Sequence, residues 1–143
     1  MAKQSVLFIC VHNSARSQMA AALMNRICGQ SFEAESAGLQ PGTLNPLAVE
    51  ALKEIDIDIS RSQPQSVDDV LRSGKTFDLV VTVCSEAEAE GCPVFPGATR
   101  RLHWPFEDPA KFVGTDEQRL EKTRRVREQI RRKLESFCGD VSL

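Results

Sequence analysis

The segment Cys10-Val-His-Asn-Ser-Ala-Arg16-Ser17 combines the residue types that bind and attack a tetrahedral oxyanion. It follows a short apolar run and precedes a helix-forming segment, so loop amides and a helix N-terminus should converge there with positive partial charge. A cysteine thiolate is stabilised in such a place and becomes a nucleophile. The planar guanidinium of Arg16 can bind two oxygens of an oxyanion, and the Ser17 hydroxyl can donate to the sulfur. Asn13 tolerates the left-handed backbone that a tight loop requires.

We therefore expect Cys10 to be the nucleophile of an oxyanion site. The predicted oxyanion-binding residues are Val11, His12, Asn13, Ser14, Ala15, Arg16 and Ser17. A nucleotide-type phosphate loop is excluded because the chain has no Gly-x4-Gly-Lys sequence. A bare Cys-x5-Arg match also arises by chance, as a buried cysteine beside a surface arginine, but the strand–loop–helix context favours the oxyanion site. His12 is assigned no catalytic role, since a loop histidine is more often structural.

Cys84 ends a second apolar run, and Cys92 follows eight residues later. If the strands are parallel, Cys84 ends at the same sheet edge as Cys10, which brings both thiols to one site. The residues between Cys84 and Cys92 favour a helix, which would separate the two α-carbons by about 12 Å at ~1.5 Å per residue. A disulfide tolerates at most ~7 Å between α-carbons. A Cys84–Cys92 disulfide therefore requires this segment to unwind, and we expect oxidation and conformational change to be coupled.

Other interpretations of these thiols remain open. Cys84 could be simple strand core with Cys92 at the surface, or both could join His103 in a zinc site, although their spacing matches no common ligand pattern. Cys28 and Cys138 are interpreted as inert. An odd count of five cysteines, with no evident secretory leader, favours free thiols in a reducing compartment such as the cytoplasm over a disulfide framework.

Asp108 precedes Pro109 and is the candidate general acid. Proline pushes the preceding residue to an extended backbone, which suits an exposed loop. Asp-Pro alone is a common turn signal, but its position after the other motifs favours an acid that protonates a departing oxygen. Glu107 is the second choice.

Composition limits the remaining possibilities. The 143 residues are 41% hydrophobic and 27% charged, typical of one globular domain spanning residues 1–143. No apolar stretch approaches the roughly 18–20 residues of a membrane span, and a net charge of -2 with no tyrosine gives no indication of nucleic-acid binding. The last predicted helix carries a run of basic residues that we interpret as a solvated face: Arg124, Arg125, Arg127, Arg131, Arg132 and Lys133.

Apolar runs and helix signals alternate along the chain. The predicted strands are 5–10, 32–37, 78–84 and, more weakly, 98–104. The predicted helices are 17–28, 45–56 with Asn45 as N-cap, 67–71, and a long helix from a Thr115–Gln118 capping box to 137. Strands that are apolar on both faces and alternate with helices predict an α/β fold: a single three-layer domain with a central four-stranded parallel sheet and helices on both faces.

The string CVHNSARSQMA at Cys10–Ala20 resembles the active-site loop of the low-molecular-weight tyrosine phosphatase superfamily. Within it, Asn13–Ala20 is similar to the thioredoxin-coupled arsenate reductases. The similarity continues through Ser36–Gly38, Val81–Cys84 and His103–Pro109, and so covers nearly the whole chain. The resemblance implies the low-molecular-weight phosphatase-like fold.

For the reaction, the resemblance implies that Cys10 attacks arsenate and forms a covalent thiol–arsenate adduct, with Asp108 as proton donor. Cys84 then attacks Cys10, which expels arsenite and leaves a transient Cys10–Cys84 disulfide. Cys92 resolves this bond, and the Cys84–Cys92 disulfide passes to thioredoxin. Arsenate and reduced thioredoxin are the expected partners of a cytoplasmic monomer, without a cofactor, metal, nucleic acid or membrane.

Two further functions remain open. A phosphatase acting on phosphotyrosine or another phosphomonoester needs only Cys10, but the aromatic pair that follows Asp-Pro in many tyrosine phosphatases is replaced here by Ala110-Lys111-Phe112. A non-enzymatic thiol switch would use the Cys84–Cys92 pair but would leave the Arg16-bearing loop unexplained.

Overall fold

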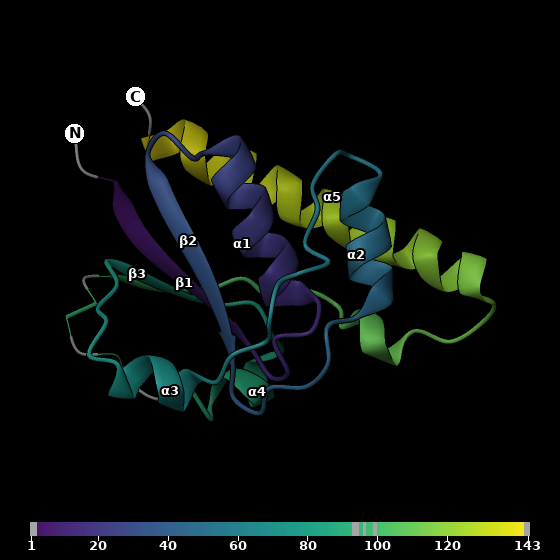
Figure 1. Ribbon diagram of the computed structural model, residues 1–143. Coiled ribbons are helices and arrows are strands. Elements are labelled where there is room, and N and C mark those ends of the chain that lie inside the picture. Colours follow the sequence, from purple (N-terminus) through teal and green to yellow (C-terminus); the bar gives the residue numbers. More distant parts are fainter. Residues whose placement is uncertain (1–2, 93–94, 96, 99, 142–143) are drawn as a thin grey trace.

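The computed structural model describes residues 3–92, 95, 97–98 and 100–141 (Figure 1). Within them, the strands are β1 (Gln4–Cys10), β2 (Phe32–Gly38), β3 (Leu79–Thr82) and β4 (Arg100–His103). They form one sheet in the order β2-β1-β3-β4, and every neighbouring pair is parallel. The predicted parallel sheet is therefore confirmed, including the weakest of the expected strands, which is β4.

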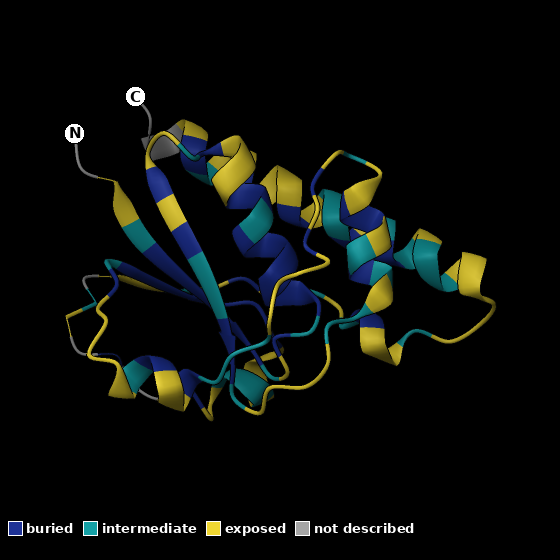
Figure 2. Ribbon diagram, in the orientation of Figure 1, coloured by how far each residue is buried: buried dark blue, intermediate teal, exposed yellow. Residues whose placement is uncertain are grey.

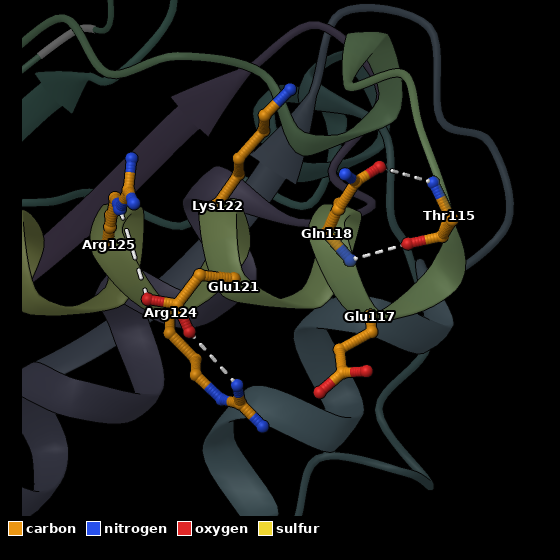
Figure 3. A pocket seen from close by; sticks show the side chains of 7 residues that line it. All are labelled: Thr115, Glu117, Gln118, Glu121, Lys122, Arg124 and Arg125. Carbon is orange, nitrogen blue, oxygen red and sulfur yellow. Dashed lines mark hydrogen bonds and ion pairs between the residues drawn. The ribbon is translucent and has the colours of Figure 1, made fainter.

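The helices are α1 (Arg16–Ile27), α2 (Pro46–Lys53), α3 (Val67–Arg72), α4 (Glu86–Ala89), α5 (Asp116–Val141) and the 3-10 turn η1 (Pro109–Lys111). α1, α2, α3 and α5 begin within one residue of their predicted starts, α4 lies in the stretch expected to favour a helix, and η1 is not predicted. Asn45 caps α2 by accepting a 2.8 Å hydrogen bond from the Leu47 amide. Thr115 and Gln118 form the predicted capping box of α5, with reciprocal hydrogen bonds of 2.9 and 3.1 Å (Figure 3).

The ends of two helices differ from the prediction. α2 ends at Lys53, earlier than expected, because Asp56 has a left-handed φ of 63° and the Ile57 amide bonds back to the Leu52 carbonyl at 3.0 Å. α5 continues past residue 137 to Val141.

Two apolar clusters cover the two faces of the sheet. Val6, Phe8 and Cys10 of β1 belong to the cluster that includes residues of α1 and α5. Their neighbours Leu7 and Ile9 belong to the other cluster, which includes residues of α3. Alternating side chains of one strand are thus buried on opposite faces, with α1, α2 and α5 over one face and α3 on the other (Figures 1 and 2). This arrangement is the predicted three-layer α/β domain.

The interpretation of Cys28 and Cys138 as inert thiols is wrong. They form a disulfide, with α-carbons 6.3 Å apart and a sequence separation of 110 residues. Cys28 is the C-cap of α1 and Cys138 lies in the last turns of α5, and these two helices pack against each other along the same face of the sheet. Their pairing follows from how α1 and α5 meet in space, which no local sequence signal indicates. The expectation that every cysteine is a free thiol fails with it.

The basic face of α5 is largely paired within the chain. Arg124 and Arg127 both bind the Glu54 carboxylate beside α2, at 2.6 and 2.9 Å. Arg131 pairs with Glu128 on the same helix at 2.7 Å. These contacts support the structural interpretation of the basic run. None of the helices in the described ranges is both long and apolar enough to cross a membrane.

Candidate active site: an oxyanion loop between β1 and α1

The loop between β1 and α1 is shaped by the segment that follows β2. Four carbonyls of the loop region accept backbone hydrogen bonds of 2.7 to 3.1 Å from that segment: Cys10 from Leu39, Val11 from Gln40, His12 from Gly42 and Ser14 from Asn45. In a planar trans peptide the next amide points opposite to the carbonyl. The amides of residues 11, 12, 13 and 15 therefore point to the other side of the loop, which makes a cradle for an anion.

Gly38 allows the loop to approach β2. A Cβ at Gly38 would lie 2.8 Å from the Asn13 nitrogen and 2.8 Å from the Val11 oxygen, both backbone atoms. Any larger residue would push the loop away from the sheet. From the sequence, Gly38 is noted only within the Ser36–Gly38 stretch that carries the family resemblance. Asn13 itself has a φ of 51°, the left-handed conformation expected for it.

The Cys10 sulfur is held by a chain of hydrogen bonds. The Asn13 amide donates to Cys10 Sγ at 3.2 Å, and Ser17 Oγ lies 2.9 Å from the same sulfur. Asn13 Nδ2 donates to Ser17 Oγ at 2.7 Å, so this oxygen accepts from Asn13 and its own proton is available for the sulfur. The Gln65 amide fixes the orientation of the Asn13 side chain by donating to Oδ1 at 3.0 Å. The arrangement thus aims two hydrogen-bond donors at the Cys10 sulfur and fixes its position in the loop.

Arg16 is buried at the first position of α1, with 4% of the residue exposed. Its Nη1 lies 3.4 Å from Glu88 Oε1 and 3.4 Å from the Phe106 carbonyl, and its Nη2 lies 3.4 Å from Asp108 Oδ2. These distances exceed the usual 2.7–3.2 Å of a strong hydrogen bond. These contacts of the guanidinium are therefore weak, and its N–H groups can donate to a bound oxyanion instead.

Asp108 is positioned by the turn that it caps. Its Oδ1 accepts a 2.9 Å hydrogen bond from the Ala110 amide at the start of η1, while Oδ2 faces Arg16. The structure thus brings Asp108 and Arg16 together, although they are far apart in sequence. Glu107, the second-choice acid, is exposed.

Cys84 and Cys92 lie at the two ends of α4 but pack into different apolar clusters. Cys84 is fully buried in the cluster that contains Cys10. Burial raises the pKa of Cys84 to about 11, and the Arg16 charge opposes this shift. Cys92 is buried in the other cluster, where burial raises its pKa against the effect of Arg101. The two cysteines are thus packed on opposite faces of the sheet, and a bond between them requires the α4 segment to rearrange.

The side chains of the two histidines bond to groups other than the Cys10 sulfur. His12 Nδ1 is 2.9 Å from the Gln40 carbonyl at the surface, and His103 Nδ1 is 2.6 Å from Thr82 Oγ1. Across residues 3–92, 95, 97–98 and 100–141, no three His, Cys, Asp or Glu side chains gather in a way that could hold a metal ion.

Sequence reasoning missed Glu88 as a site residue. Its carboxylate contacts Arg16 and also completes a capping box with Ser85 at the start of α4. The Ser85-x-x-Glu88 pattern is a recognisable capping signal, so the local role was open to prediction. The contact with Arg16, 72 residues away in sequence, was not.

The fold and this loop agree with known proteins over almost the whole chain. The sequence profile described as low molecular weight phosphotyrosine protein phosphatase matches residues 5–142. The chain belongs to this family. The resemblance predicted from the Cys10–Ala20 string is therefore confirmed.

The relatives of this family member include bacterial arsenate reductases. The chain is 42% identical over 138 residues to an arsenate reductase of Halalkalibacterium halodurans and 41% identical over 139 residues to one of Bacillus subtilis, with 96% of this chain and 97% of each relative covered. A solved arsenate reductase of Archaeoglobus fulgidus superposes with a TM-score of 0.74 at 36% identity, covering 94% of this chain and 98% of that one. A thioredoxin-dependent arsenate reductase of Corynebacterium glutamicum gives a TM-score of 0.62 at 31% identity, covering 94% of this chain and 63% of that one.

Proposed function

We propose that this protein is an arsenate reductase in which Cys10, Cys84 and Cys92 act in sequence. The observation that carries the proposal is the burial of Cys84 in the same apolar cluster as Cys10 of the oxyanion loop, with Cys92 on the segment that follows Cys84. Cys10 receives two hydrogen-bond donors in the loop. The similarity to arsenate reductases over nearly the full length supports the choice of substrate.

The first step uses the loop, Arg16 and Asp108. Arsenate binds to the loop amides and to the Arg16 guanidinium, which replaces its long contacts with shorter ones to two oxyanion oxygens. The Cys10 sulfur attacks arsenic, so an S–As bond forms and an As–O bond breaks. Asp108, beside Arg16, donates the proton with which the departing oxygen leaves as water.

The second step reduces arsenic. The Cys84 sulfur attacks Cys10 Sγ, so an S–S bond forms and the S–As bond breaks. The electron pair of that bond stays on arsenic, which changes from As(V) to As(III) and leaves as arsenite. Cys92 then attacks Cys84 and releases the Cys10 thiolate. The resulting Cys84–Cys92 disulfide takes two electrons and two protons from reduced thioredoxin, which becomes oxidised.

The proposed reaction bears on the oligomeric state, the cofactor requirement and the compartment of the enzyme. The loop, the acid and the three cysteines all belong to one chain, so a monomer contains everything the cycle uses. The relay takes its electrons from reduced thioredoxin and needs no resident metal or cofactor. A thioredoxin-dependent cycle favours a cytoplasmic enzyme, even though the Cys28–Cys138 pair is oxidised.

A second candidate is a phosphomonoester phosphatase. It is favoured by the family match and by the fact that the Cys10 loop and Asp108 suffice for phosphoryl transfer to a cysteine. It leaves Cys84 and Cys92 without a role. A thiol switch without catalysis explains those two cysteines but not the Arg16–Asp108 pair.

The test is NADPH oxidation with thioredoxin and thioredoxin reductase, with and without arsenate. We expect sustained arsenate-dependent oxidation by the wild type and none by Cys10→Ser. Cys92→Ser should release one equivalent of arsenite and then stop, because its Cys10–Cys84 disulfide is not resolved. The double variant Cys28→Ser/Cys138→Ser is the control, assayed at a temperature at which its melting curve shows it folded. It removes two cysteines outside the relay without leaving an unpaired thiol, and it should still cycle.

Two outcomes contradict the proposal. Normal cycling by Cys92→Ser would remove Cys92 from the relay. No arsenate-dependent oxidation by the wild type, alongside Cys10-dependent hydrolysis of p-nitrophenyl phosphate, would identify a phosphatase instead.

A further inference from the structure

Glu88 connects the oxyanion-binding arginine to the segment that carries the two relay cysteines. Its Oε1 lies 3.4 Å from Arg16 Nη1. The same oxygen accepts a 3.0 Å hydrogen bond from the Ser85 amide, and the Glu88 amide donates to Ser85 Oγ at 3.2 Å. One carboxylate thus caps α4 and also ties it to the first residue of α1. α4 contains no buried residue, although its partly buried Ala89 packs against the apolar core.

A bound oxyanion must compete with Glu88 for Arg16. In the described structure, Nη1 is directed at Glu88 and the Phe106 carbonyl, and Nη2 at Asp108. When a tetrahedral oxyanion binds the guanidinium through two oxygens, Arg16 donates its hydrogen bonds to these oxygens instead of to the groups that it contacts now. It also brings negative charge close to two carboxylates that share one buried cation, and like charges at such distances repel.

The two carboxylates are held differently. Asp108 Oδ1 accepts a hydrogen bond from the Ala110 amide at the start of η1, so the position of Asp108 depends on that turn and not on α4. Glu88 remains ionised, because the Ser85 backbone hydrogen bond, the Ser85 hydroxyl and the Arg16 charge together lower its pKa against the effect of burial. Because Glu88 Oε1 faces Arg16 Nη1, an oxyanion that binds this nitrogen takes the place of the Glu88 carboxylate. Since Glu88 forms part of the α4 cap, its movement loosens α4.

We propose that Glu88 is a latch: it holds α4 closed through Arg16, and an oxyanion in the loop displaces it and frees the Cys84–Cys92 segment to rearrange. The inference rests on the proposed function in taking arsenate as the oxyanion and the cysteines as the relay. It makes Glu88 a positioning residue that couples substrate binding to the conformational change. The relay segment then opens when substrate is bound and stays packed when the loop is empty.

The test uses inorganic phosphate, which fits the same loop but cannot be reduced. Protein kept reduced is treated with iodoacetamide, and alkylation of each cysteine is followed by peptide mass spectrometry. Protection of Cys10 gives the Kd of phosphate, and the alkylation rate of Cys92 reports the opening of α4. In the wild type, we expect saturating phosphate to accelerate Cys92 alkylation about five- to tenfold, the low end of typical coupling between sites.

Three variants distinguish the contact of Glu88 with Arg16 from its role in capping α4. Glu88→Gln keeps an oxygen for the Ser85 amide but removes the charge, so Cys92 should react fast without phosphate. By thermodynamic reciprocity, phosphate should then bind tighter by the same five- to tenfold factor and accelerate Cys92 no further. Glu86→Gln loses the same charge from an exposed position of α4 and should behave as the wild type. Ser85→Ala removes the hydroxyl of the cap but keeps the Glu88 charge beside Arg16, so it should speed Cys92 alkylation and tighten phosphate binding less than Glu88→Gln does.

The outcomes distinguish the latch from the proposed function. An unchanged Kd of phosphate in Glu88→Gln would overturn the latch, whether or not Cys92 alkylation rises, since a rise alone is what the loss of a cap predicts. Phosphate that fails to accelerate Cys92 alkylation in the wild type would overturn it as well. Neither readout involves arsenate or thioredoxin, so a protein that does not reduce arsenate could still show the latch, and the reverse also holds.

Discussion

Replacing Cys138 with serine removes the Cys28–Cys138 disulfide and should lower the thermal stability by a calculable amount. The bond closes a loop across 110 residues of sequence. In the chain-entropy treatment, a loop of that length restricts the unfolded chain enough to stabilise the folded state by roughly 5 kcal/mol. For a domain near this size, 1 kcal/mol shifts Tm by about 3 °C, so we expect a loss of about 15 °C. The same loss should follow when the wild type is reduced.

Circular dichroism melts of oxidised wild type, reduced wild type, Cys28→Ser and Cys138→Ser measure this effect. The double variant Cys28→Ser/Cys138→Ser should have the same Tm as each single variant, because either substitution alone removes the disulfide. Thiol titration of denatured protein should find two more reactive thiols after reduction than before. A Tm that changes by less than about 3 °C on reduction would refute the loop-closure reasoning, and an unchanged thiol count would show that the bond does not form.

The other predictions concern the reaction itself. Asp108→Asn keeps a side chain beside Arg16 but cannot donate the proton, so the first step should slow by about 10²- to 10⁴-fold in rapid-quench single turnovers. An unchanged rate would remove the role of Asp108. Because burial raises the pKa of Cys84 to about 11, its thiol is protonated near neutrality, so arsenite release in single turnovers should accelerate about tenfold per pH unit from pH 7 to 9. A flat profile in that range would show that opening of α4, or another step, activates Cys84 beforehand.

The features that sequence predicted well are those set by neighbours along the chain. Runs that are apolar at every position become buried parallel strands because both of their faces need cover. Asn45 and Thr115 cap helices through hydrogen bonds to amides two or three residues away, so their roles can be predicted from the neighbouring sequence. The Cys10–Ser17 segment is equally local, because the nucleophile, the arginine and the loop between them are contiguous.

The features that sequence did not predict join distant segments. The Cys28–Cys138 bond depends on the packing of α1 against α5. Glu88 meets Arg16 only because the segment after β3 passes over the start of α1. Gly38 is required by the backbone of Asn13, which no pattern within β2 reveals. In each case the partner is brought by the tertiary fold, so composition and periodicity contain no signal for it.

The order of the strands explains how the same oxyanion loop suits both phosphoryl transfer and reduction. β1 and β3 are neighbours, Ile9 is paired with Thr82, and the Val83 amide bonds to the Ile9 carbonyl at 2.9 Å. The chain therefore leaves both strands at one edge, and whatever follows β3 lies beside the Cys10 loop. A phosphatase needs nothing more from that place than room for its substrate. In the proposed relay, a segment with a cysteine at each end and a carboxylate that reaches Arg16 adds electron transfer there without altering the loop. The parts that reduction adds to phosphoryl transfer then lie in one short segment, and we expect Cys92→Ser to stop reduction while leaving the binding of phosphate by the loop intact.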